Sequence, residues 1–234
     1  MPHRRSFTLE SAILAASTLF LTLPSFAQPS YARMAPLADY LISNRNAEIE
    51  LARSAAPSSI SRDAKILVLT SKGYETAATG SNNFVCLVLR SWASATDDPE
   101  FWNAKVRAPI CLDPAAARTV LPHILKKTEW ALAGLSKDQI AAKLKLALRT
   151  GQLAPPAPGA MGYMMSNAAY LFDADPHWRP HLMFFLPTTD AARWGANLPG
   201  SPIFASQNPN ERLTIFYVPV GRWSDDSLAP PPDR

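Results

Sequence analysis

The chain has 234 residues, with 23 basic and 19 acidic side chains and a formal net charge of +4. These charges are scattered along the chain and form no basic block, which argues against nucleic acid as a partner. The length suffices for one domain with a substantial core.

The first 27 residues have the pattern of an export signal, which cleavage removes from the mature chain. Arg4 and Arg5 supply positive charge, and the apolar run 11–24 that follows is too short to span a bilayer. Ser25-Phe-Ala27 then places small residues where a signal peptidase cuts, so we predict a mature chain that begins at Gln28. Removal of this segment lowers the net charge to +3.

The signal also bears on the export route and the compartment. Arg4-Arg5-Ser6-Phe7 resembles a twin-arginine signal, but this pattern is short, and we favour the Sec route. No later segment is long and apolar enough for a membrane helix. We therefore expect a soluble protein in the periplasm or outside the cell, without a transmembrane anchor in the mature chain.

Cys86 and Cys111 are the only cysteines, and both lie in the exported part. An isolated pair in an oxidising compartment usually forms a disulfide, so we predict this bond. A closed loop of this length would stabilise the fold by about 3 kcal/mol in the chain-entropy model. A catalytic thiol at either position would require both cysteines to stay free.

Two helices come first in the mature chain. Pro36 lies near the start of a short helix that reaches Ile42. Asn44 or Asn46 can cap a second helix, and Pro57 ends it. The second helix has few apolar residues, which indicates a helix that lies on a sheet.

Three strands follow, and the turns between them predict an antiparallel meander over 65–70, 74–79 and 84–90. The first and third strands are apolar on both faces, so we expect both faces of the sheet to be covered. Residues 91–107 have no clear period and predict a long loop that its aromatic side chains pin to the core.

Two helices are predicted in the middle of the chain. Asp113-Pro114 opens the first, Pro122 kinks or splits it, and Gly134 ends it. Ser136-Lys-Asp-Gln139 is a capping box for the second, which buries a stripe of Ile140, Leu144, Ala147 and Leu148 and ends at Gly151.

Strands return after a Pro-rich connection at 152–159. We predict strands over 161–165, 168–172 and 181–186, a short helix over 189–194 with Thr189 as its cap, a closing hairpin of 202–206 and 213–220, and a disordered tail over 229–234. This order of elements indicates an α+β fold: a single domain over 28–228 with a mainly antiparallel sheet, N-terminal helices and two helices inserted mid-chain.

Several segments resemble a family of bacterial exported proteins of unknown function. They are Ala47-Glu-Ile-Glu-Leu-Ala-Arg-Ser-Ala-Ala56, Gly73-Tyr-Glu-Thr76, Asn83-Phe-Val-Cys-Leu-Val88, Pro99-Glu-Phe-Trp102 and Gly195-Ala-Asn-Leu-Pro-Gly-Ser201. The resemblance extends over nearly the whole mature chain and implies one domain and export. It implies no activity and no catalytic residues.

The familiar catalytic signatures are absent from the sequence. It contains no Gly-x-Ser-x-Gly elbow, Gly-rich phosphate loop, His-Glu-x-x-His or Cys-x-x-Cys, and nothing in it indicates a particular cofactor. Whether the protein is an enzyme stays open at this point.

The segment 173–181 is the strongest candidate for chemistry because it concentrates histidines and acids. His177 and His181, with Asp175, could act in acid–base catalysis, and the two histidines with Asp173 could hold a metal such as zinc. Pro176 and Pro180 exclude the helix that would make the histidines neighbours, so a site needs the loop to turn back. The alternative, which we favour, is a structural loop whose histidines bond backbone carbonyls.

Neighbouring Arg and Trp residues form the second candidate. Trp178 with Arg179, and Arg193 with Trp194, lie at predicted element ends and could bind a planar or anionic ligand. The alternative is that each Trp anchors a loop and the Arg stem covers it.

These observations favour a binding domain for a small ligand or an envelope partner. A His/Asp- or metal-dependent periplasmic enzyme that uses residues 173–181 is the alternative, and a structural accessory protein of the envelope is the second alternative. The sequence indicates neither the ligand nor the oligomeric state.

Overall fold

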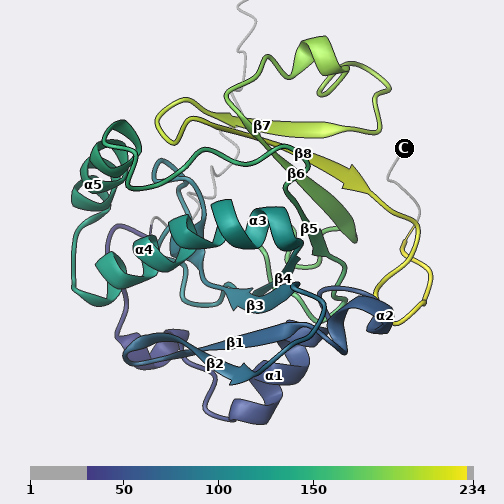
Figure 1. Cartoon of the computed structure of the whole chain (residues 1–234), viewed down its shortest axis with the longest axis horizontal. Coiled ribbons are helices and arrows are strands. Elements are labelled where there is room, and N and C mark those ends of the chain that lie inside the picture. Colours follow the sequence, from purple (N-terminus) through teal and green to yellow (C-terminus); the bar gives the residue numbers. More distant parts are fainter. Residues whose placement is uncertain (1–30, 231–234) are drawn as a thin grey trace, which may run out of the picture.

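One open sheet of eight strands organises the computed structural model, which describes residues 31–230 (Figure 1). The predicted signal at 1–27 and the last four residues of the predicted tail lie outside the described residues. The strands are β1 (Lys65–Thr70), β2 (Gly73–Ala78), β3 (Val85–Leu89), β4 (Ala108–Leu112), β5 (Met161–Met164), β6 (His181–Pro187), β7 (Phe204–Asn208) and β8 (Leu213–Pro219). With the helices on its faces, the sheet forms a single α+β domain, as predicted.

The helices fall before and within the run of strands. The α-helices are α1 (Arg45–Arg53), α2 (Ser58–Ser61), α3 (Pro114–Thr119), α4 (Leu121–Leu132) and α5 (Lys137–Arg149), and single 3₁₀ turns are η1 (Leu37–Tyr40), η2 (Ser91–Ala93) and η3 (Ala192–Trp194). Of the described residues, no helix combines the length and apolarity that crossing a membrane requires.

The strand order is β2-β1-β3-β4-β5-β6-β8-β7, and neighbours are antiparallel except for β1 and β3. The predicted meander is therefore wrong in one respect. β1 and β2 form the expected hairpin, but β3 lies on the other side of β1 and runs parallel to it.

Gly80 explains how the chain leaves β2 and reaches the far side of β1. A Cβ atom at Gly80 would lie 2.2 Å from the backbone nitrogen of Lys65, so only glycine allows this approach. Beyond it, the amides of Ser81 and Asn82 both donate to the carbonyl of Asp63 at the entry to β1. The turn residues at 80–83 thus form a crossing, where a hairpin was expected.

β4 carries one half of the disulfide and was not predicted, because Pro109 interrupts its short apolar run. The proline is tolerated since β5 pairs only with Cys111 and Leu112, which leaves the earlier part of that edge without a ladder partner. Cys111 lies directly opposite Cys86 on β3, and the two form the predicted disulfide.

Most helix ends follow the local signals of the sequence, but α1 ends at Arg53, before the predicted stop at Pro57, and Pro57 instead precedes α2. The side chains of Asn44 and Asp113 accept the backbone amides of Ala47 and Ala116 and so cap α1 and α3. The chain divides into α3 and α4 just before Pro122. The capping box that was predicted for α5 is present with both of its hydrogen bonds, those of Ser136 and Gln139.

Helices cover both faces of β1, β3 and β4, as the apolar strands predicted. On one face, α1 packs its small residues against a cluster that includes Ile66, Cys86 and Val88. On the other face, α3 and α4 pack against a cluster that includes Leu67, Leu87, Ile110 and Leu112. The disulfide belongs to the α1 side.

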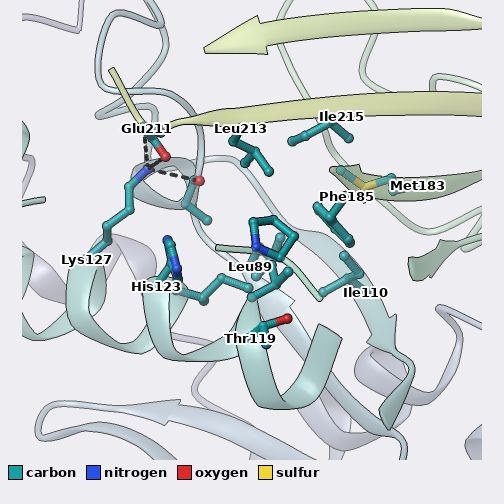
Figure 2. A pocket seen from close by; sticks show the side chains of 14 residues that line it. Leu89, Ile110, Thr119, His123, Lys127, Met183, Phe185, Glu211, Leu213 and Ile215 are labelled. Atoms are coloured by element: carbon teal, nitrogen blue, oxygen red, sulfur yellow. Dashed lines mark hydrogen bonds and ion pairs between the residues drawn. The ribbon is translucent and has the colours of Figure 1, made fainter. Parts of the chain in front are cut away.

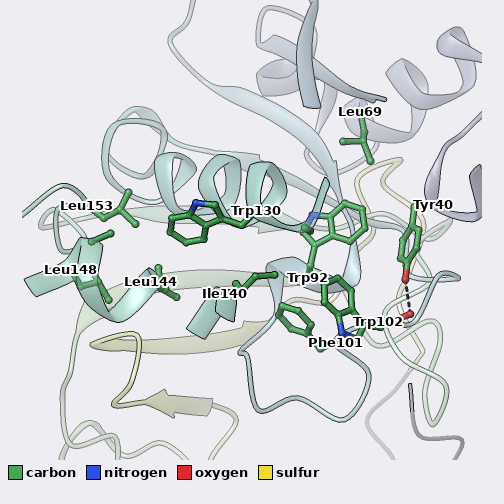
Figure 3. Packing of buried hydrophobic residues seen from close by; sticks show 12 residues of the cluster. Tyr40, Leu69, Trp92, Phe101, Trp102, Trp130, Ile140, Leu144, Leu148 and Leu153 are labelled. Carbon is green, nitrogen blue, oxygen red and sulfur yellow. Dashed lines mark hydrogen bonds between the residues drawn. The ribbon is translucent and has the colours of Figure 1, made fainter. Parts of the chain in front are cut away.

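The loop 91–107 is pinned by aromatic side chains, as predicted (Figure 3). Trp92, Phe101 and Trp102 are buried in one cluster with Tyr40 and with the predicted stripe of α5. The ring of Tyr40 lies 4.8 Å from that of Trp92, and its hydroxyl donates to the carbonyl of Trp102 at 2.8 Å.

Two details of the C-terminal half differ from the predictions. Residues 168–172 form no strand, since only Tyr170 makes an isolated bridge to Arg107. Thr189 caps no helix: its hydroxyl donates to the carbonyl of Pro187, and only the turn η3 follows before Gly195. The strand β6 and the closing hairpin of β7 and β8 are confirmed.

The segment 188–203 covers one face of this hairpin and also closes its edge. Ala191 and Ala196 pack against Phe216 of β8. At the outer edge of β7, the side-chain amide of Asn197 donates to the carbonyl of Ala205 at 2.8 Å and accepts its amide proton at 2.9 Å. Asn197 holds a positive φ of 60° in this position.

Candidate functional site

A partly open cavity of about 90 Å³ lies between the helices α3 and α4 and the strands β6 and β8 (Figure 2). One face of β6 supplies Met183 and Phe185, and the matching face of β8 supplies Leu213 and Ile215. The other lining residues are Leu89, Ala93, Ile110, Thr119, Val120, His123, Ile124, Lys127, Pro156 and Glu211. The wall is thus mostly apolar, and the charged side chains of Lys127 and Glu211 lie together at one end.

The secondary structure explains why these side chains meet. Alternate residues of a strand point to the same face, so Met183 and Phe185 on β6, with Leu213 and Ile215 on β8, form one apolar surface. The residues Val120, Ile124 and Lys127 recur at helical spacing and line the opposite wall. The Pro-rich connection at 152–159 adds Pro156.

The polar end of the cavity is a buried ion pair between Lys127 of α4 and Glu211, which lies in the turn between β7 and β8. The ammonium nitrogen lies 3.1 Å from Glu211 Oε1, and the two side chains are 2% and 8% exposed. The same nitrogen also donates to the backbone carbonyls of Ala93 and Ser94. The buried charge is therefore fully surrounded by acceptors.

His123 lies one turn before Lys127 and lines the same cavity. Its Nε2 lies 2.8 Å from the carbonyl of Ala154. Because a carbonyl only accepts, Nε2 carries the proton and Nδ1 is an acceptor in the neutral ring. Burial lowers the pKa of His123, which favours this neutral form.

The structure separates the residues predicted for acid–base chemistry. His177 and Asp175 are exposed, whereas His181 is buried at the start of β6. His181 donates from Nδ1 to the carbonyl of Arg179 at 2.7 Å, and burial lowers its pKa to about 4. Within the part of the chain that the structure describes, no hydrogen bond joins these three side chains, and the bonding of His181 is that of the structural alternative.

Asp173 takes part in a different group, which ties three segments together. Its carboxylate accepts hydrogen bonds from the hydroxyls of Tyr31 and Tyr170, both at 2.7 Å, from Lys105 at 2.9 Å and from Asn103 at 3.1 Å. These donors hold the pKa of Asp173 well below its ordinary value. The carboxylate thus anchors its loop to the chain at Tyr31 and to the 91–107 loop.

The predicted metal ligands were His177, His181 and Asp173. Among residues 31–230, no three or more His, Cys, Asp or Glu side chains form a group that could hold a metal ion. The geometry therefore gives the metal hypothesis no support.

The predicted binding residues do not form one pocket. Trp178 packs beside His181, with ring centroids 4.5 Å apart, and also contacts Tyr217 of β8. Trp194 contacts Phe216 instead and is 60% exposed. Because Phe216 and Tyr217 are successive strand residues, the two tryptophans lie on opposite faces of the sheet.

The two predicted arginines do not combine with these tryptophans into a shared site either. The backbone carbonyl of Arg179 accepts the bond from His181. Arg193 forms a surface ion pair with Asp190 at 3.4 Å, and its side chain is 86% exposed.

The sequence analysis did not predict the cavity, although one residue of α4 indicates a buried polar group. The buried stripe of α4 includes Leu121, Ile124 and Ala131, and Lys127 falls within it. A lysine on the apolar face of a helix requires a buried acceptor. Its partner Glu211, however, lies 84 residues further along and carries no such signal.

Comparisons with protein-family models, with curated proteins and with solved structures gave no match for this chain. The resemblance to a family of exported bacterial proteins therefore stays a prediction.

Proposed function

We propose that this protein is an exported binding domain that holds a small ligand in the cavity between α3, α4, β6 and β8. The observation that carries the proposal is a partly open, mostly apolar cavity at the junction of helices and sheet, with polar groups at one end. Ligand sites in proteins commonly combine an apolar wall with a few placed polar groups.

The energetics of the cavity support this function. A ligand that fills this mostly apolar cavity would remove apolar surface from water and gain van der Waals contacts with the wall. The buried pair of Lys127 and Glu211 keeps one wall fixed before any ligand arrives.

Export is the second part of the proposal. Its supports are the signal pattern at 1–27 and the disulfide between Cys86 and Cys111, a bond that persists in oxidising compartments. Cell fractionation followed by N-terminal sequencing tests this part, and we expect a periplasmic or secreted chain that begins at Gln28. A full-length chain in the cytosol would contradict it.

Binding is tested with a panel of small apolar and amphiphilic compounds and cell-wall fragments, screened by thermal shift. We expect hits to shift the NMR signals of Met183 and Ile215. Replacement Leu213→Trp fills the cavity and should weaken binding by about tenfold or more, equivalent to ~1.4 kcal/mol. Leu182→Trp is the matched control, because Leu182 lies on the opposite face of β6. Equal affinity in both variants would refute the assignment of the site.

A further inference from the structure

The cavity contains two charged side chains, Lys127 and Glu211, yet we infer that its ligand is uncharged and largely apolar. This inference rests on the proposed binding function and names the ligand class. It follows from how the donors and acceptors of the polar end are already used.

Lys127 offers no free donor to an anionic ligand. An ammonium group has three protons, and here the carbonyls of Ala93 and Ser94 and the carboxylate of Glu211 accept them. With only 2% of the side chain exposed, the group has no room to turn toward a second carboxylate.

Glu211 is equally unsuited to a cationic ligand. Its two carboxylate oxygens lie 3.1 and 3.4 Å from the ammonium nitrogen of Lys127, so the pair carries no net charge. Because the two opposite charges largely cancel, neither a ligand cation nor a ligand anion gains a net attraction from the pair.

The other polar side chains of the wall are also engaged within the chain. Thr119 donates its hydroxyl proton to the carbonyl of Ala115 and accepts the amide proton of Ala157. His123 donates its Nε2 proton to the carbonyl of Ala154, which leaves Nδ1 as an uncharged acceptor. A charged ligand would therefore lose its hydration in a mostly apolar cavity without a group of opposite charge to compensate it, which opposes its binding.

The test compares three ligands with the same eight-carbon chain at pH 7.5: 1-octanol, octanoate and octylammonium. Binding to the full mature protein is followed by the methyl NMR signals of Met183 and Ile215. We expect 1-octanol to bind at least about tenfold more tightly than either ion. An ion that binds as tightly as 1-octanol, or more tightly, would overturn the inference and leave the proposed pocket in place.

Binding of none of the three would overturn the pocket function itself, and this inference with it. The variant Glu211→Gln supplies a second measurement, because it removes the negative charge with little change in shape. In this variant octanoate should gain affinity relative to 1-octanol, whereas octylammonium should not. An unchanged ratio of octanoate to 1-octanol would contradict the argument from charge neutralisation. Circular dichroism checks that the variant is folded, and the wild-type comparison decides by itself if it is not.

Discussion

The burial of His181 makes the stability of this protein depend on pH in a defined window. In the folded chain the ring is 2% exposed, donates to the carbonyl of Arg179 and has a pKa of about 4. In the unfolded chain a histidine has a pKa of about 6.5. Between these two values only the unfolded chain binds the proton, so acid favours unfolding. The stabilisation is complete above pH 6.5 and is lost as the pH falls to 4.

The expected size of this effect follows from the difference between the two pKa values. About 2.5 pH units at ~1.4 kcal/mol each correspond to a loss of about 3 kcal/mol from His181 between pH 7 and 4. His181→Asn is the comparison, because its amide can still donate to the Arg179 carbonyl but cannot gain a proton.

Urea unfolding of both proteins at pH 7.5, 6, 5 and 4 measures the effect. The variant loses ring packing and should be less stable at pH 7.5. The difference in the free energy of unfolding between wild type and variant should then decrease by about 3 kcal/mol toward pH 4. The carboxylates also titrate in this range, but they are present in both proteins and do not change the difference. A gap that does not change with pH would refute the burial of a neutral His181.

Three further predictions concern bonds that hold the fold. Glu211→Ala should lower the free energy of unfolding by about 3–5 kcal/mol because it leaves Lys127 as an uncompensated buried charge; a loss below about 1 kcal/mol in urea titration would show that water solvates the ammonium. Replacement of Cys86 and Cys111 together by serine opens a loop with a sequence separation of 25 and should cost about 3 kcal/mol. Reductant should then destabilise the wild type alone. Asp173→Asn should be less stable than the wild type at neutral pH; in thermal unfolding from pH 7 downward this deficit should shrink once the pH falls below about 4, the pKa of an aspartate in the unfolded chain, and continue to shrink toward the depressed pKa of the folded chain.

Local signals predicted α1, α3, α4 and α5, but they missed the short helix α2 and indicated a helix over 189–194 where only η3 forms. The capping box at Ser136, the Asp113-Pro114 start and the break near Pro122 depend on residues within one turn of each other, so the sequence contains all that decides them. The same holds for the β1–β2 and β7–β8 hairpins, whose turns are short.

The order of strands could not be predicted in this way. A turn at 80–83 suits both a hairpin and a crossing, and the choice depends on the close approach of Gly80 to Lys65. That contact is a property of the packed structure. In the same way, the short strand β4 exists because β3 and β5 flank it, although Pro109 weakens its pattern.

The candidate site was harder to predict than the fold because its parts are distant in sequence. The segment 173–181 concentrates histidines and acids, but its side chains diverge: Asp173 bonds Tyr31 and Lys105, and His181 bonds a carbonyl. The cavity instead unites α3, α4, β6 and β8 through mostly apolar residues of ordinary type. Composition within a short window therefore pointed to side chains that the fold separates.

Asn197 makes it harder for the edge strand β7 to pair with a strand of another molecule. An exposed edge strand invites another chain to extend the sheet, which is a common origin of aggregation. At Ala205 a side-chain amide already fills both backbone positions, so the chain supplies its own substitute for a neighbouring strand. The hairpin that lines the cavity can thus remain at the end of the sheet, close to solvent, without offering Ala205 as a template for a second molecule.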